Sequence, residues 1–220
     1  RVVISDASNK TAQKFQPFGL TDSPYPEDLW AWLDETSRDT GVDFVAIPHN
    51  SNISKGYMFD LRTLRGSAID QDYAIRRMKW EPIVEITQIK GDSETHPTLA
   101  IDDSFADFEE YPYYIQRSET GYQAEQGDYI RSALKRGLGL GVALGINPYQ
   151  FGVIGSTDSH TALSSAEEDN FHGKLATDSI PERKNLRRMT SSGSSGWAMS
   201  ASGLAAVWAE ENTRKSILSA

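Results

Sequence analysis

The stretch FGVIGSTDSH, residues 151–160, starts with a short apolar run and ends in small and polar residues. Residues 151–154 predict a buried strand, and the polar residues after them predict its end. Asp158 and His160 follow, separated by one residue. Side chains at the carboxyl ends of strands line the ligand-binding crevice of barrels and doubly wound sheets, so this pair is a candidate metal site. A capped turn beside a surface histidine has the same pattern and is the alternative.

The composition is that of a globular protein. Of the 220 residues, 38% are hydrophobic and 24% are charged, which excludes a disordered chain and allows one domain with a sizeable core. No apolar run approaches the roughly 20 residues of a bilayer-spanning helix, so we expect no membrane-embedded segment. The net charge of −9 argues against non-specific nucleic-acid binding and is compatible with cation sites. Without cysteine there is no disulfide, thiolate zinc site or cysteine nucleophile, and the compartment stays open.

Strand-like and helix-like segments alternate along the chain, which is typical of a parallel α/β sheet or barrel. Strands are predicted at residues 1–5, 43–48, 83–89, 151–154 and 203–208. Helices are predicted at residues 26–41, 69–80, 129–144 and 213–220. Segments 6–23, 50–67 and 102–110 are predicted loops. Positions 137, 139 and 141 are glycines inside a predicted helix, where we expect close packing against a neighbour.

The sequence opens inside its first predicted strand and ends within a predicted helix, with no initiator methionine and no signal peptide. We therefore interpret residues 1–220 as a single domain that is a fragment of a longer protein. Residues 161–196 are poor in apolar residues and rich in serine and glycine, and they predict a surface excursion within that domain.

Histidines follow three of the predicted strands, at His49, His96 and His160. Glu85 lies on one strand, and Asp158 follows another. Imidazole and carboxylate groups are the donors that zinc, manganese or iron binds where thiolates are absent. A packing role for His49 and a surface-loop position for His96 are the alternatives.

Other common catalytic motifs are absent. The sequence has no Gly-Lys-Ser/Thr phosphate loop of the Walker type and no Gly-x-Ser-x-Gly nucleophile elbow. The run GLGLG, residues 137–141, lies inside a predicted helix instead of between a strand and a helix, which argues against dinucleotide binding. A metal site is therefore the chemistry that the motifs favour.

Three motifs in order resemble a known family: IPHNSN at residues 47–52, VEITQIKGDSE at residues 84–94, and the segment 139–160 with its GINP and GSTDSH. Together they are similar to DUF3604, a bacterial family described only as a domain of unknown function. That family resembles the PHP (polymerase and histidinol phosphatase) metallohydrolases, and the resemblance covers nearly the whole chain. It implies an α/β fold, a distorted (β/α)7 PHP- or TIM-like barrel that is incomplete in this chain.

The resemblance also implies a site of two or three metals at the carboxyl ends of the strands. Its metal ligands would be His49, Asp158 and His160, and its catalytic residues would be Glu85 and His49. PHP-like proteins begin with a His-x-His motif, which this sequence lacks. We therefore expect a half-assembled site that neither binds the full set of metals nor turns over substrate alone.

The implied function is that of a metal-dependent hydrolase, in particular a phosphoesterase with metal-bound hydroxide as the nucleophile. Zinc, manganese or iron would be the divalent ions, and Lys90, Asp92 and Glu94 would contact a small-molecule phosphoester. Hydrolysis of another ester or an amide on an amidohydrolase-like scaffold is the alternative among enzymes. The alternative that is not an enzyme is a non-catalytic binding domain that keeps the fold but has lost its metal ligands. The sequence does not separate a periplasmic from a cytoplasmic location in a bacterium.

Overall fold

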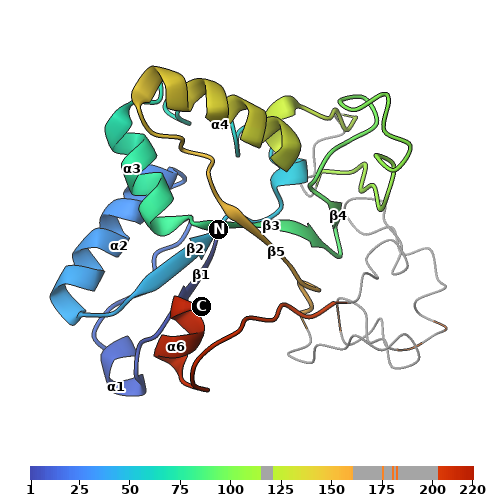
Figure 1. Cartoon of the computed structure of the whole chain (residues 1–220). Helices are drawn as coiled ribbons and strands as arrows, with labels where there is room; N and C mark the ends of the chain where they lie inside the picture. The colour runs from blue at the N-terminus through green and yellow to red at the C-terminus, as the bar shows by residue number, and fades with distance from the viewer. Residues whose placement is uncertain (115–120, 161–174, 176–179, 181, 183–202) are drawn as a thin grey trace.

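Short strands lie at the centre of the molecule, and helices surround them (Figure 1). The computed structural model describes residues 1–114, 121–160, 175, 180, 182 and 203–220. The strands are β1 (Val2–Ser5), β2 (Phe44–Ile47), β3 (Ile83–Gln88), β4 (Gly91–Asp92) and β5 (Gly152–Gly155). The helices are α1 (Asn9–Ala12), α2 (Pro26–Thr40), η1 (Ser51–Ile53), α3 (Gln71–Trp80), η2 (Gln126–Asp128), α4 (Ile130–Leu144) and α6 (Arg214–Ser219). Within these described residues, no helix combines the length and the apolar character needed to cross a membrane.

The strands form two small sheets. In the first, β1 pairs antiparallel with β2, and in the second β3 lies between antiparallel β4 and parallel β5. The exit of β2 is joined to β3, because the Glu85 N–H donates to the Pro48 carbonyl at 3.1 Å. The α/β class is therefore confirmed. The described residues contain a parallel pair in β3 and β5 but form no closed barrel.

Helix α2 forms where the sequence predicts it. Pro26 occupies its first turn, where a missing N–H is tolerated, and the acidic Glu27 and Asp28 follow at the positive end of the helix dipole. Gly41 ends the helix in the left-handed conformation, with φ of 70°. The apolar face of α2, which includes the fully buried Trp30, packs into the core.

The core consists of two hydrophobic clusters. The first packs α2 against β2 and the end of α3, and its buried members are Leu29, Trp30, Leu33, Val42, Phe44, Ala46 and Trp80. The second packs α4 against β3 and the loop after η1, and its buried members are Met58, Phe59, Ile69, Val84, Ile130, Ala133 and Tyr149. Tyr73 on α3 borders both clusters. Helix α3 therefore connects the two halves of the core.

The structure corrects some of the elements predicted from the sequence and confirms others. Residues 203–208 are not a strand, because no neighbouring strand pairs with this apolar run in the part of the chain described. Trp208 at the end of the run is fully exposed. The predicted loop 6–23 contains α1, and β4 forms directly after β3, where the sequence predicts no strand. The predicted terminal helix is confirmed as α6, and Thr213 caps it, since its side chain accepts from Ser216 N. The predicted surface excursion, residues 161–196, lies outside the described residues apart from 175, 180 and 182.

The glycines of α4 differ in their surroundings. A Cβ atom at Gly137 would lie 2.2 Å from Asn147 Oδ1 and 2.9 Å from Tyr149 Cβ. A Cβ atom at Gly139 would meet nothing within 4 Å. The predicted close packing is therefore confirmed at Gly137 and wrong at Gly139, which is exposed.

This difference gives a matched pair of substitutions in one helix. We expect Gly137→Ala to lower the free energy of unfolding by about 1–3 kcal/mol, because the added methyl overpacks the contact with the 147–149 segment. Gly139→Ala is expected to raise it by about 0.5–1 kcal/mol, because alanine loses less backbone entropy in a helix. Urea unfolding of both variants beside wild type measures the two effects. Equal shifts in both variants would contradict the packing argument.

Candidate functional site

The exits of three strands bring the candidate site together. His49 follows β2, Glu85 lies on β3, and Asp158 and His160 follow β5. Glu85 is opposite Ile154 in the parallel β3–β5 pair, and the Ile89 N–H donates to the Thr157 carbonyl at 3.4 Å beyond the last paired residues. The chain after β5 therefore stays alongside the chain after β3, which places Asp158 beside the end of β3.

Glu85 holds the ring of His49. One carboxylate oxygen of Glu85 contacts His49 Nδ1, and the other accepts the Asn50 N–H at 3.2 Å. Asn50 adopts the left-handed conformation with φ of 56°, which turns the chain sharply after His49. A carboxylate on Nδ1 fixes the tautomer and orientation of an imidazole, so His49 presents Nε2 on its other side.

Both imidazoles face one oxygen of Asp158. Asp158 Oδ1 lies 3.7 Å from His49 Nε2 and 3.4 Å from His160 Nε2. Two donors bound tetrahedrally to one ion at about 2.1 Å lie about 3.4 Å from each other. The separations of Asp158 Oδ1 from the two ring nitrogens therefore have the size expected of donor pairs that share a cation.

The second oxygen of Asp158 contacts a buried ammonium group. Lys90 is only 3% exposed, and its Nζ donates to Asp158 Oδ2 and, at 2.9 Å, to Gln88 Oε1. Gln88 in turn donates from Nε2 to Asn50 Oδ1 at 2.6 Å. Lys90, predicted as a substrate contact, is thus brought into the site and turned towards Asp158. Asn50 was missed by sequence reasoning, although an asparagine directly after a strand exit is a recognisable signal for a left-handed turn.

Asp92 and Glu94, the other two predicted substrate contacts, have partners away from the strand ends. The Asp92 carboxylate accepts the N–H groups of Glu94 and Thr95 at 3.0 and 3.3 Å, and Glu94 pairs with Arg131 on α4 at 2.7 Å. Burial raises the pKa of Asp92 to about 6, against the lowering effect of these backbone hydrogen bonds. The carboxylate thus shapes the turn after β4.

His96 packs among tyrosines instead of lying on an open surface loop. Its ring centroid is 6.0 Å from that of Tyr122 and 5.7 Å from that of Tyr129. Its Nε2 lies 3.4 Å from a carboxylate oxygen of Glu110, and its side chain is 15% exposed. His96 is therefore in a loop, but its side chain is less exposed than the surface-loop alternative predicts, because it packs against these tyrosines.

The donor types at the strand ends fit zinc, manganese or iron, which accept imidazole nitrogen and carboxylate oxygen. Within the described ranges, however, no group of three or more histidine, aspartate or glutamate side chains could hold a metal ion as placed. The donors therefore fit a cation in pairs, and these pairs do not amount to a complete metal site.

Comparison with known families gives one result. A family model described as "Protein of unknown function (DUF3604)" matches residues 1–220. Neither the search of curated proteins nor the search of solved structures produced a match. The match covers all the strand exits that form the site.

The raised pKa of Asp92 predicts a pH-dependent effect on stability. In the unfolded chain the carboxyl group titrates near pH 3.9, as ordinary aspartates do. Because its pKa is higher in the native state, its negative charge at pH 7 costs more free energy in the native state than in the unfolded chain. Lowering the pH through about 6 towards 4 protonates the native carboxyl first, which removes that penalty. We expect Asp92→Asn to have a higher free energy of unfolding than wild type at pH 7. We expect this difference to disappear by pH 4.

Urea unfolding of both proteins at pH 7, 6, 5 and 4 measures this difference. Asp39→Asn, at an exposed position of α2, controls for the change in net charge. A gap between wild type and Asp92→Asn that stayed constant or widened towards pH 4 would contradict the assignment.

Proposed function

The chain belongs to the DUF3604 family, and from this membership and the geometry of the strand exits we propose that it carries part of the active site of a metal-dependent hydrolase of the PHP type. The observation that carries the proposal is that Asp158 Oδ1 lies 3.7 Å from His49 Nε2 and 3.4 Å from His160 Nε2. Two donor pairs that share this oxygen, drawn from two distant segments of the chain, favour a bound cation over a capped surface turn.

The proposed architecture is a distorted (β/α)7 barrel of which these strands form a part. In its support, α3 lies between β2 and β3 in the chain, and α4 lies between β3 and β5. Strands β3 and β5 are parallel, as strands joined by a helical crossover are. His49 follows β2, and Asp158 and His160 follow β5, so these donors lie at the carboxyl ends of strands, where barrels of this kind carry their active sites.

In this proposal His49, Asp158 and His160 are the metal ligands, and Glu85 acts through His49. Glu85 fixes the ring so that Nε2 is directed towards Asp158. Lys90 holds Oδ2 of Asp158 and leaves Oδ1 to the cation. A bound divalent ion would lower the pKa of a water molecule and would stabilise the negative charge that develops on the reacting group.

The proposed substrate is a small-molecule phosphoester, as the resemblance to PHP enzymes implies. The buried Lys90 Nζ lies beside the strand ends, where an ammonium group would stabilise a phosphoryl oxygen. Another ester or an amide remains the second candidate among hydrolases. A binding domain without catalysis differs from both in that its ligand affinity would not depend on Asp158.

The experiment that tests this proposal measures metal and activity together in the natural full-length protein. Asp158→Ala and His49→Ala are expected to lower Mn²⁺ or Zn²⁺ affinity at least tenfold and to abolish phosphatase activity on p-nitrophenyl phosphate, because each removes a ligand. Glu85→Gln is expected to weaken metal binding by about 10- to 100-fold, because it removes the group that orients a ligand. Calorimetric metal titration and a phosphate-release assay give the two readouts.

Asp39→Ala on the exposed surface of α2 is the control, and circular dichroism confirms that each variant is folded. Unchanged metal affinity in both Asp158→Ala and His49→Ala would disprove the metal site. A binding module would be identified by two results together. Wild type would show no activity, and a folded Asp158→Ala variant would bind the phosphoester as tightly as wild type does.

A further inference from the structure

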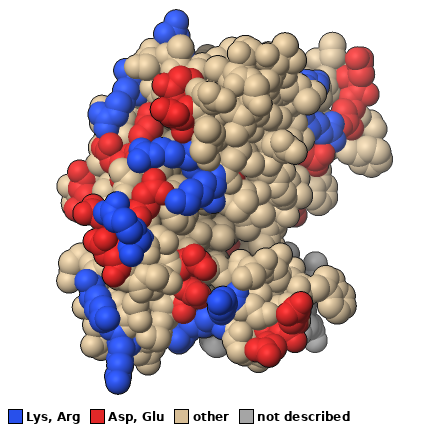
Figure 2. Space-filling view, turned by 60° about the vertical axis from the view of Figure 1, so that its left-hand side comes forward, with Lys and Arg blue, Asp and Glu red and all other residues tan. Residues whose placement is uncertain are grey.

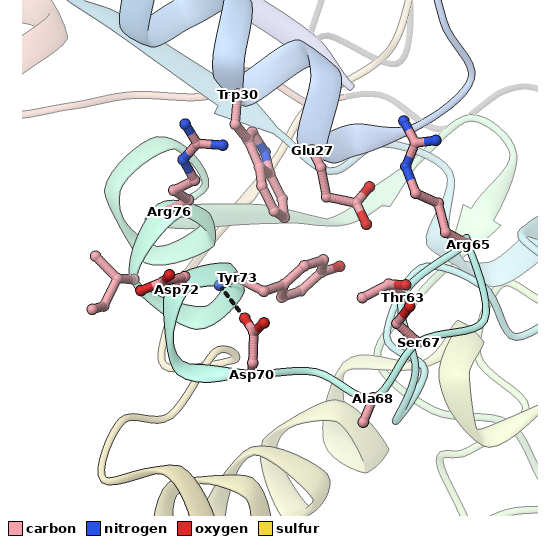
Figure 3. A pocket seen from close by; sticks show the side chains of 11 residues that line it. Glu27, Trp30, Thr63, Arg65, Ser67, Ala68, Asp70, Asp72, Tyr73 and Arg76 are labelled. Carbon is pink, nitrogen blue, oxygen red and sulfur yellow. Dashed lines mark hydrogen bonds between the residues drawn. The ribbon is translucent and has the colours of Figure 1, made fainter.

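A cavity lies apart from the strand exits. It has a volume of about 470 Å³ and is bounded by the first turn of α2, the loop before α3, and α3 itself (Figure 3). This volume is in the range of small-molecule sites in proteins. Tyr73 and Ile75 of α3 line it, and so does the fully buried Trp30 of α2. Trp30 and Tyr73 meet edge to face, with ring centroids 4.9 Å apart, which makes this wall aromatic and rigid.

Two residues that line this cavity each have a buried side-chain oxygen without a partner in the described part of the chain. Glu27 Oε2 and Thr63 Oγ1 are buried and accept or donate no hydrogen bond among the residues that the structure describes. Figure 3 shows the Glu27 carboxylate directed into the cavity above Tyr73 and towards the side where Thr63 lies. Buried polar atoms are nearly always hydrogen-bonded in native proteins, so two orphans in one cavity indicate a ligand that satisfies both.

The cations at the rim are engaged elsewhere. Arg65 donates to both carboxylate oxygens of Asp28 at 2.7 Å and stacks on the Tyr25 ring at 3.7 Å. Arg76 pairs with Asp34 at 3.3 Å. Figure 2 shows basic and acidic side chains interspersed on the face turned forward, without a patch of a single sign. The Glu27 carboxylate is therefore not neutralised by either arginine of the rim.

The chemistry of these atoms defines the ligand. An ionised carboxylate only accepts hydrogen bonds, so the group that satisfies Glu27 has to donate. Thr63 Oγ1 can accept from the same donor. An ammonium group has three N–H bonds and a positive charge, and it matches both requirements at once.

We propose that this cavity binds a small organic cation with a primary ammonium group. The ammonium donates to Glu27 Oε2 and Thr63 Oγ1, and the aliphatic part of the ligand packs on Tyr73. The site is independent of the strand exits, because the cavity lining includes none of His49, Glu85 or Asp158.

The test is a calorimetric titration of the 220-residue chain with n-butylammonium chloride. We expect saturable one-to-one binding, at least tenfold weaker in Glu27→Gln, because the substitution keeps the shape and removes the charge. Thr63→Val is expected to weaken binding by a smaller factor. Glu35→Gln, an exposed position on the same helix outside the cavity, makes the same charge change and is expected to leave affinity unchanged.

Nuclear magnetic resonance locates the probe independently of affinity, through the amide shifts of Thr63 and Tyr73. The proposal is overturned if wild type shows no saturable binding, or if Glu27→Gln and Glu35→Gln weaken binding equally. Saturable binding of inorganic phosphate in place of n-butylammonium would also overturn it, since the rim arginines would then define the ligand. If Glu27→Gln fails to fold, Thr63→Val and the amide shifts still decide.

Discussion

A buried carboxylate, Glu81, is the interaction on which the arrangement of this chain depends. It is 1% exposed, and it accepts hydrogen bonds from Arg1 before β1 at 2.7 Å and from the Trp30 indole of α2 at 2.9 Å. Arg77, one turn earlier on α3, pairs with it at 3.3 Å. Burial raises the pKa of Glu81, but Arg1 and Arg77 outweigh that effect and lower it, so the group stays ionised. One charge thus connects the first strand with two helices.

Arg77 extends this network into the second half of the core. Its guanidinium donates to the Met58 carbonyl at 3.0 Å and lies over the rings of Phe59 and Tyr149, 5.4 and 4.7 Å from their centroids. Buried ion pairs are weak evidence for stability, but removing one partner leaves an uncompensated charge. Because Glu81 stands two residues before β3, the network anchors the chain at the entry of β3, the strand that carries Glu85.

Local signals in the sequence accounted for most of the elements that position the site. The proline start and glycine end of α2 and the apolar runs of β2, β3 and β5 are readable because capping and burial act over a few residues. The same reasoning failed at residues 203–208, where an apolar run has no strand beside it in the described structure. It also failed at β4, whose pairing with β3 needs a tight turn through residues 89–90 and a positive φ at Gly91. Strand formation requires a partner, and a partner is not a local property.

The sequence by itself determined which chemical groups follow the strands: an imidazole at His49, a carboxylate and an imidazole at Asp158 and His160, and an ammonium at Lys90. Only the tertiary structure decided how they meet. Glu85 reaches His49 across 36 residues, and Lys90 reaches Asp158 across 68, through the alignment of β2, β3 and β5. Residue type follows from the sequence directly. The distances and directions between donor atoms depend on hydrogen bonds between strands that are far apart in the chain, and these form only when the core packs.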